Sequence, residues 1–151
     1  MPFSKKVVTL IAEDDAGHLR LIEKNLARSG LRSPIIKFDN GQSVLDFLFG
    51  RGSGDHRASD TPYFLLLDIN MPKVSGVEVL RQVKADESLR RMPVVMLTTA
   101  DDPSEVDRCH TIGCSNYIVK PINYDSFAAA IATIGCYIAL ASVPPLSPVN
   151  S

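Results

Sequence analysis

Four runs of apolar residues in this chain each end in polar side chains that could act together. In chain order, these polar residues are Glu13, Asp14 and Asp15, then Asp68, then Thr98 and Thr99, and finally Lys120. Clustered carboxylates repel one another, and Mg²⁺ suits their neutralisation because it takes a few carboxylate or carbonyl oxygens and keeps some waters. A lysine and a hydroxyl beside such a metal would hold a phosphoryl group. Together these residues predict a phosphoryl-transfer site, provided that the fold gathers them.

Each of these residues also has a purely structural interpretation. An acidic triplet after a strand commonly caps the next helix, and Asp68 alone is as well explained by capping as by chemistry. A threonine often ends a strand, and a lysine before a proline is often simply solvated. The convergence of all of them favours the functional interpretation, and only Asp15 is assigned to capping alone.

The elements that would position these residues alternate between strand and helix patterns. Strands are predicted at residues 7–12, 35–38, 64–68, 93–98 and 117–120. Helical patterns are predicted at 19–30, 44–48, 76–86 and 103–113, and a fifth helix begins at Asp125. Residues 50–61, which are rich in glycine, serine and charge, indicate a mobile surface loop.

This alternation predicts an α/β fold with a parallel sheet covered by helices on both faces. The expected architecture is a doubly wound, flavodoxin-like (βα)5 three-layer sandwich with strand order 2-1-3-4-5. The first and third strands would be neighbours at the switch point, which places Asp14 beside Asp68. We expect one domain over residues 1–151, with a core at about 6–137 and a helix extension and tail at about 138–151.

Composition limits the classes of function. The formal net charge is −1, with 45% hydrophobic and 22% charged residues, so a general electrostatic grip on nucleic acid is not expected. Three cysteines (Cys109, Cys114 and Cys136) lack metal-ligand spacing and indicate reduced thiols in a cytosolic protein. The apolar stretch near the N-terminus is too short for a signal-peptide core, so a cytoplasmic location without a membrane anchor is expected.

The C-terminal region is unusual because no charged residue occurs from Ser126 to Ser151. A helix packed only on its own sheet needs a polar outer face, and this one has none. A transmembrane span is the rival interpretation, since the apolar stretch reaches the lower limit of about 17 residues. We favour a homodimer through the C-terminal helix, with Ile138 and Leu140 in the interface and the tail after Pro144-Pro145 extending toward the partner.

Four motifs carry a family resemblance. The segments LIAEDD, LLLDINMPKVSG, PVVMLTT and GCSNYIVKP, in this order and spacing, resemble the receiver domain of two-component response regulators of the CheY type from Lys6 to about Tyr137. No output domain follows, so a stand-alone receiver is expected. The ending YDSFAAAIATIGCYIAL and the long loop after the second helix are similar to small regulators that partner phytochrome-type histidine kinases.

The resemblance implies a role for each site residue. Asp68 would accept a phosphoryl group from a kinase phosphohistidine. Mg²⁺ would be held by Asp14 and Asp68, by Glu13 through water, and by the backbone carbonyl of Asn70. Lys120 would pair with the phosphoryl oxygens, Thr98 would hydrogen-bond the attached group, and Tyr117 would move with Thr98 to change the surface shown to partners. Thr99, larger than the residue often found there, would restrict access to the phosphoryl group.

Other classes fit less well. An aspartyl-phosphate phosphohydrolase needs a second acid where Asn70 stands, and EDDAGHLR is not the glycine-rich turn of a dinucleotide site. The resemblance implies a signalling protein that catalyses only its own phosphorylation and dephosphorylation. The remaining alternative is an intermediate phosphate carrier or phosphate sink in a relay unrelated to light. The downstream partner is not identified by the sequence.

Overall fold

The computed structural model describes residues 7–31, 34–98, 103–119, 124–140 and 143–149. Strands and helices alternate along the chain, as predicted. They are β1 (Val8–Ala12), α1 (Ala16–Arg28), β2 (Ile35–Phe38), α2 (Gly41–Phe49), β3 (Tyr63–Asp68), α3 (Gly76–Ala85), β4 (Val94–Thr98), α4 (Pro103–Ile112), β5 (Asn116–Val119) and α5 (Tyr124–Leu140).

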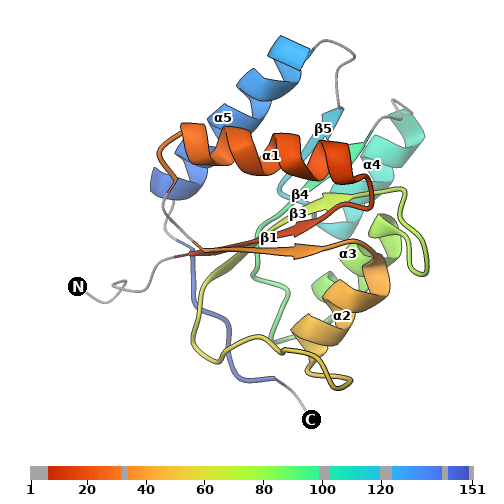
Figure 1. Ribbon diagram of the computed structural model, residues 1–151. Coiled ribbons are helices and arrows are strands. Elements are labelled where there is room, and N and C mark those ends of the chain that lie inside the picture. The colour runs from red at the N-terminus through yellow and green to blue at the C-terminus, as the bar shows by residue number, and fades with distance from the viewer. Residues whose placement is uncertain (1–6, 32–33, 99–102, 120–123, 141–142, 150–151) are drawn as a thin grey trace.

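The five strands form one parallel sheet in the order β2-β1-β3-β4-β5. Helices α1 and α5 cover one face, and α2, α3 and α4 cover the other, which gives three layers (Figure 1). The predicted flavodoxin-like fold and strand order are therefore confirmed. The order also makes β1 and β3 direct neighbours, so the residues that follow them meet at one edge of the sheet.

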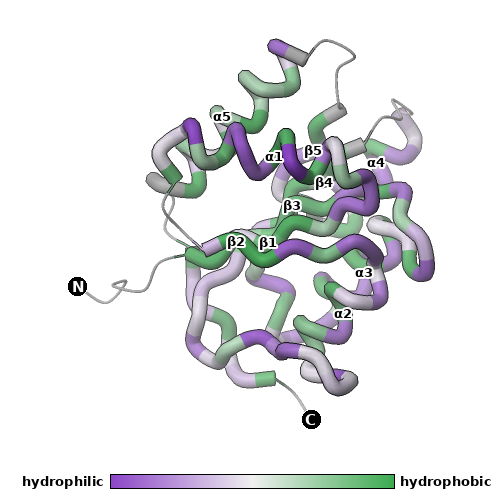
Figure 2. The backbone as a smooth tube through the Cα atoms, in the orientation of Figure 1, coloured by the Kyte–Doolittle hydropathy of each residue, from purple (hydrophilic) through white to green (hydrophobic). Residues whose placement is uncertain are grey.

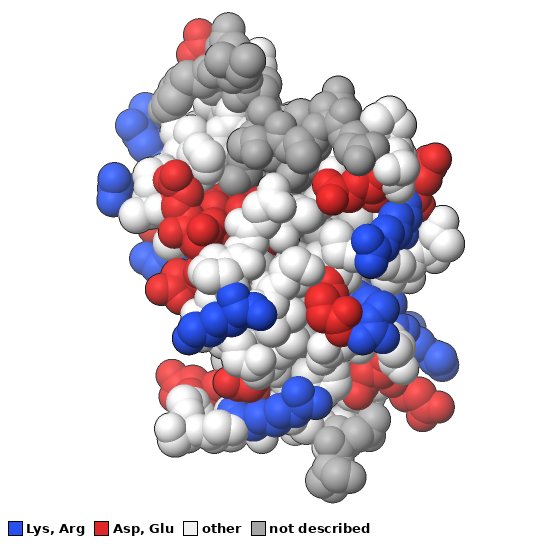
Figure 3. Space-filling view, turned by 90° about the vertical axis from the view of Figure 1, so that its right-hand side faces the viewer, with Lys and Arg blue, Asp and Glu red and all other residues white. Residues whose placement is uncertain are grey.

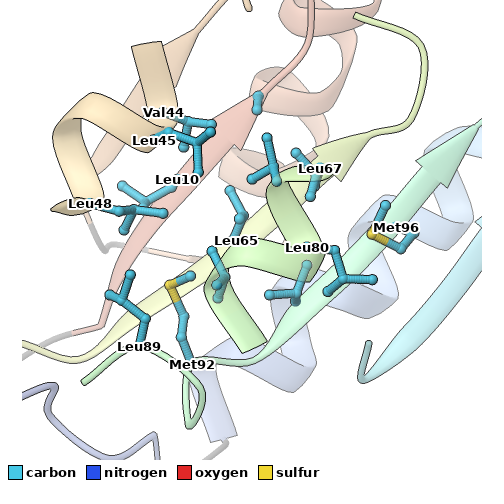
Figure 4. Close-up of a cluster of buried hydrophobic side chains, with 14 of the residues drawn as sticks. Leu10, Val44, Leu45, Leu48, Leu65, Leu67, Leu80, Leu89, Met92 and Met96 are labelled. Carbon is cyan, nitrogen blue, oxygen red and sulfur yellow. The ribbon is translucent and has the colours of Figure 1, made fainter. Parts of the chain in front are cut away.

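The central strand β3 supplies both halves of the core. All six of its residues are buried, and alternate side chains point to opposite faces of the sheet. Leu65 and Leu67 pack with α2 and α3 (Figure 4), whereas Phe64 and Leu66 belong to the cluster under α1 and α5. The unbroken apolar run reflects burial on both faces, as is typical of parallel sheets.

Polar side chains fix where the first three helices begin. Asp15 caps α1 by accepting a hydrogen bond from the His18 N–H at 2.9 Å, which confirms the capping role expected for it. Asn40 caps α2 and Ser75 caps α3 in the same way. Each cap therefore sets where the chain turns after a strand at the carboxyl edge of the sheet.

The loop between α2 and β3 differs from the surface loop that its composition suggested. Residues 51–56 are exposed, but Arg57 is only 5% exposed. Its Nε donates to the Leu48 carbonyl at 3.0 Å, and its Nη2 contacts Ser88 Oγ at 3.4 Å. Burial lowers the pKa of this guanidinium, and the cation lies at the C-terminal end of α2, where it interacts favourably with the helix dipole. This loop is anchored to the domain by a buried arginine.

The C-terminal tail lies against its own domain. Val143 and Leu146 are buried, and Leu146 joins the core cluster under α2 and α3. The Leu146 N–H donates to the Thr61 carbonyl at 3.1 Å, and the Asp60 N–H donates to the Leu146 carbonyl at 3.0 Å. In Figure 1 the tail runs from the α5 side of the sheet to the α2 side. The expectation of an arm extending away from the domain is therefore not met.

Helix α5 packs beside α1 and is mainly hydrophobic along its length, whereas α1 alternates polar and apolar residues (Figure 2). Gly135 permits this contact, because a Cβ there would lie 2.0 Å from Ser29 Oγ. Ile138 is 2% exposed and points into the domain's own core, so its predicted place in a dimer interface is wrong. Within the described ranges, no helix is long and apolar enough to cross a bilayer.

The segment after Asp68 is held by close backbone packing. The Gly76 N–H donates to the Ile69 carbonyl at 2.8 Å, and a Cβ on Gly76 would lie 2.1 Å from the Asp68 carbonyl oxygen. Gly41, at the start of α2, leaves no room for a side chain beside the Val74 carbonyl. These two glycines let the chain fold back tightly beyond Asp68.

Substituting Gly76 by alanine should therefore strain the segment that carries Asp68. The clash is with backbone atoms, so we expect Gly76→Ala to lower the free energy of unfolding by about 2 kcal/mol or more. Gly54→Ala is the matched control, because a Cβ there meets nothing within 4 Å. The free energies of unfolding of both variants are measured by urea denaturation monitored by circular dichroism. Equal stability of the two variants would contradict the packing described for Gly76.

Candidate functional site

Three carboxylates meet where β1 and β3 end. Glu13 and Asp14 follow β1, Asp68 is the last residue of β3, and one oxygen from each lies within 4.8 Å of the other two. The parallel pairing of Ala12 with Leu67 brings these strand ends side by side. Figure 3 looks onto this edge of the molecule and shows acidic side chains gathered on it. The predicted meeting of these three residues is present in the structure.

The three carboxylates differ in burial. Glu13 is 1% exposed and Asp68 is 6% exposed, whereas Asp14 is exposed to solvent. Repulsion between like charges is stronger where water does not screen it. Two buried carboxylates beside a third therefore favour the binding of a cation. The exposed Asp14 leaves one side of the group open to solvent.

Glu13 is fixed by its local contacts. Its N–H donates to the Phe38 carbonyl at 2.9 Å, and its Oε2 accepts a hydrogen bond from the Asp15 N–H at 3.2 Å. His18 Nδ1 lies 3.9 Å from Glu13 Oε1, and the His18 ring lies 6.4 Å from that of Phe127 in α5. His18 was not predicted from the sequence, although its place one turn into the helix after the acidic triplet could have suggested a contact with Glu13.

Asp68 is placed by strand pairing on its other side. It lies opposite Leu97 of β4, and the Ile69 N–H donates to the Leu97 carbonyl at 3.1 Å. Thr98 is the next residue of β4 and ends that strand, beside Val119 of β5. The backbone of Thr98 is therefore one residue beyond the partner of Asp68, at the edge where the acids gather.

Of the other residues predicted to hold the metal or the phosphoryl group, only Asn70 is fully described. Asn70 is exposed, two residues beyond Asp68 and next to Ile69, whose carbonyl is bound by Gly76. The side chain of Thr98, and the whole of Thr99 and Lys120, lie outside the described residues. Their proposed contacts with a phosphoryl group stay predictions.

Tyr117 connects the last strand to α4. It is partly buried on β5, and its hydroxyl donates to Glu105 Oε1 of α4 at 3.3 Å. Its backbone lies opposite Met96 of β4, two residues before Thr98. A change in the position of this ring would thus alter the contact between β5 and α4.

The three carboxylates suit a hard divalent cation. Carboxylate oxygens are the ligands that Mg²⁺ and the similar Mn²⁺ prefer, and Mg²⁺ keeps several waters, for which the exposed side at Asp14 leaves access. Among the residues that the structure describes, no second group of three acidic, histidine or cysteine side chains comes this close together. The same cluster places one carboxylate, Asp68, at a strand end where it can act as a nucleophile.

Comparison with known proteins identifies the domain. The sequence matches the response regulator receiver domain over residues 9–132. A receiver domain structure from Rhodospirillum rubrum is 41% identical and superposes with a TM-score of 0.87, covering 93% of this chain and 99% of that one.

Two cyanobacterial regulators are also similar. Response regulator Rcp1 of Synechocystis is 33% identical over 77% of this chain and 78% of its own length. The structure of its Mn²⁺-bound form has a TM-score of 0.81, with 27% identity over 91% of this chain and 98% of that one. The phosphorylated cyanobacterial phytochrome response regulator RcpA has a TM-score of 0.82, with 28% identity over 93% of this chain and 99% of that one. By fold, sequence match and the arrangement of its strand-end residues, the chain belongs to the response regulator receiver domain family.

Proposed function

We propose that this receiver accepts a phosphoryl group on Asp68 from the phosphohistidine of a sensor histidine kinase, in a reaction that requires Mg²⁺. The observation that carries the proposal is the meeting of Glu13, Asp14 and Asp68 at the carboxyl edge of the sheet. The family supports it, since response regulators act in two-component signalling. The phosphorylated form of RcpA is a precedent for modification, and the Mn²⁺-bound form of Rcp1 is a precedent for metal binding.

The transfer follows from the chemistry of the site. An Asp68 carboxylate oxygen attacks phosphorus, the bond from phosphorus to the kinase histidine nitrogen breaks, and an acyl phosphate forms on Asp68. Asp14, Asp68, the Asn70 carbonyl and, through water, Glu13 would hold Mg²⁺, which when bound neutralises phosphoryl charge. Lys120 would stabilise the charge that develops on the phosphoryl oxygens.

The response would pass through Thr98 and Tyr117. In the proposed switch, the Thr98 hydroxyl bonds the new phosphoryl group and Tyr117 follows into the space that Thr98 leaves. The hydrogen bond from Tyr117 to Glu105 would then break, which would change the surface shared by α4 and β5. Phosphorylation would thus add charge at Asp68 and shift the equilibrium between two arrangements of Thr98 and Tyr117.

The kinase partner is inferred from the relatives. Similarity to RcpA and Rcp1 favours a kinase of the phytochrome type and hence a light signal. The alternative is a carrier or phosphate sink in another relay. A carrier would pass its phosphoryl group onward to a histidine phosphotransfer protein, whereas a terminal regulator would keep it until hydrolysis.

The first test is removal of the acceptor. Incubation with acetyl phosphate and Mg²⁺ should add one phosphoryl group to the natural chain, and Asp68→Asn should reduce incorporation to background because the nucleophile is gone. Asp39→Asn is the control, because this exposed acid follows the neighbouring strand β2 but lies outside the three-carboxylate group. Intact-mass measurement reads the result. Labelling of Asp68→Asn at the natural level would place the acceptor elsewhere.

The second test concerns the metal. Asp14→Asn should weaken Mg²⁺ binding about tenfold or more, equivalent to about 1.4 kcal/mol, because it removes one charged ligand. Asp15→Asn is a matched control, since asparagine keeps the α1 cap and Asp15 is not in the cluster. Calorimetric titration compares the variants, and a chelator should stop phosphorylation without unfolding the domain. Phosphorylation that continues in chelator would contradict the role of the acids.

We further propose a homodimer built on the outer face of α5. The exposed face between Ser126 and Tyr137 carries no charge, and Tyr137 is 55% exposed beside a groove of about 550 Å³. The groove lies between β5 and α5, with Phe64, Ile118 and Ile134 among its apolar walls. Because β5 is an edge strand, a second copy can reach this groove without displacing the domain's own helices.

The dimer test uses Tyr137, the exposed large hydrophobic residue of this face. Tyr137→Glu should convert a dimer, measured by light scattering at micromolar concentration as about twice the monomer mass, into a folded monomer. Ser53→Glu should leave the dimer intact, because Ser53 is exposed in the loop between α2 and β3 and does not belong to the α5 face. Charges at Ile138 are unsuitable because that residue belongs to the core. A natural chain that is monomeric under these conditions would contradict the dimer.

A further inference from the structure

The C-terminal end of α4 brings two cysteines together. Gly113 follows the helix with φ +125°, and the N–H groups of Gly113 and Cys114 both donate to the Cys109 carbonyl, at 3.0 and 3.1 Å. In such a helix ending, the residue after the glycine folds back over the last turn and packs on the residue whose carbonyl it binds. Cys109 and Cys114 are accordingly buried in the same core cluster.

The two thiols have different surroundings. Cys109 is fully buried, whereas Cys114 is 8% exposed and its Sγ lies 3.7 Å from Nδ1 of the exposed His110. The Lys84 side chain runs past Gly113, and its ammonium donates to the Arg90 and Met92 carbonyls at 3.0 and 2.6 Å. Cys114 therefore combines a small opening to solvent, a neighbouring base and a nearby cation.

The electrostatics follow this division. Burial raises the pKa of the Cys109 thiol to about 11, which keeps it protonated. Burial also raises the pKa of Cys114, but the Lys84 charge opposes that rise. Cys114 is thus the thiol that a reagent from solvent reaches first, and Cys109 is a second, fully buried thiol beside the same helix end.

We propose that Cys109 and Cys114 form a redox-sensitive pair that a hydroperoxide converts into an intramolecular disulfide. The Cys114 sulfur attacks one peroxide oxygen, the O–O bond breaks, and His110 Nδ1 passes the thiol proton to the departing oxygen. The products are a sulfenic acid on Cys114 and an alcohol, or water when the reagent is hydrogen peroxide. The Cys109 sulfur then attacks the Cys114 sulfur, the S–OH bond breaks, and the Cys109 proton joins the departing hydroxide as water. Two thiols have lost two electrons in total, and the peroxide is reduced.

The bond would tie the end of α4 to the start of β5. Ser115, next to Cys114, is already held to β4, because its N–H donates to the Val94 carbonyl at 2.7 Å. Tyr117 follows two residues later and reaches back to Glu105 of α4. Oxidation would therefore rigidify the turn between these elements, independently of Asp68.

The test uses the folded chain in a Cys136→Ser background, because Cys136 is exposed and would crosslink between molecules. Hydrogen peroxide should lower the intact mass by about two units, protect both remaining thiols from alkylation after denaturation, and be reversed by dithiothreitol. Adding Cys109→Ala should instead leave a dimedone-trappable sulfenic acid on Cys114. Adding Cys114→Ala should leave Cys109 unmodified.

The role of His110 is tested by His110→Gln in the same background, which should slow disulfide formation about tenfold or more through loss of the base. Circular dichroism establishes that each variant is folded. Two results would overturn the proposal: both thiols remaining fully alkylatable after peroxide, or Cys109 reacting as readily without Cys114 as with it. An unchanged rate in His110→Gln would remove the histidine from the mechanism and with it the step proposed here.

Discussion

Electrostatic repulsion among Glu13, Asp14 and Asp68 is the constraint around which this domain is arranged. Two of these carboxylates are buried and all three offer oxygens within 4.8 Å of one another, a placement that favours a bound cation. The fold maintains it by pairing β1 with β3, by capping α1 with Asp15, and by folding the chain tightly back at Gly76. The strands β4 and β5 then place the backbone of Thr98 one residue beyond the partner of Asp68, and Tyr117 two residues back along the neighbouring strand.

Most of the fold could be predicted because its signals are local. The uninterrupted apolar run of β3 indicates a strand buried on both faces, and helical spacing between such runs implies crossovers that have one hand. The meeting of Glu13, Asp14 and Asp68 could be predicted by the same reasoning, because parallel strands end at one edge of the sheet and these residues end β1 and β3. The capping role of Asp15 could be predicted because an aspartate just before a helix commonly accepts a hydrogen bond from the first turn of that helix.

Two of the features that were missed, the burial of Arg57 and the packing of the tail, depend on contacts between segments far apart in the sequence. Arg57 lies in a segment of loop composition, and only the folded chain shows that it fills the space below α2 and reaches Ser88. The tail was expected to extend toward a partner chain, but Leu146 is buried in its own domain. It is hydrogen-bonded there to Thr61, more than 80 residues earlier in the sequence. Ile138 was assigned outward because a helix that is apolar all round gives no periodicity from which to orient it. His18 was missed because its partner, Glu13, lies outside the helix that carries it.

The most direct measurement of the central claim is the free energy of unfolding in urea, with and without Mg²⁺, for the natural chain and Asp68→Asn. Without metal, the variant should be the more stable, because it removes one of three mutually repelling charges. The natural chain should gain about 2.7 kcal/mol when Mg²⁺ is one hundred times its dissociation constant, and the variant should gain much less. If Mg²⁺ leaves both chains unchanged, and the variant is no more stable without it, the three carboxylates do not form the cation site described here.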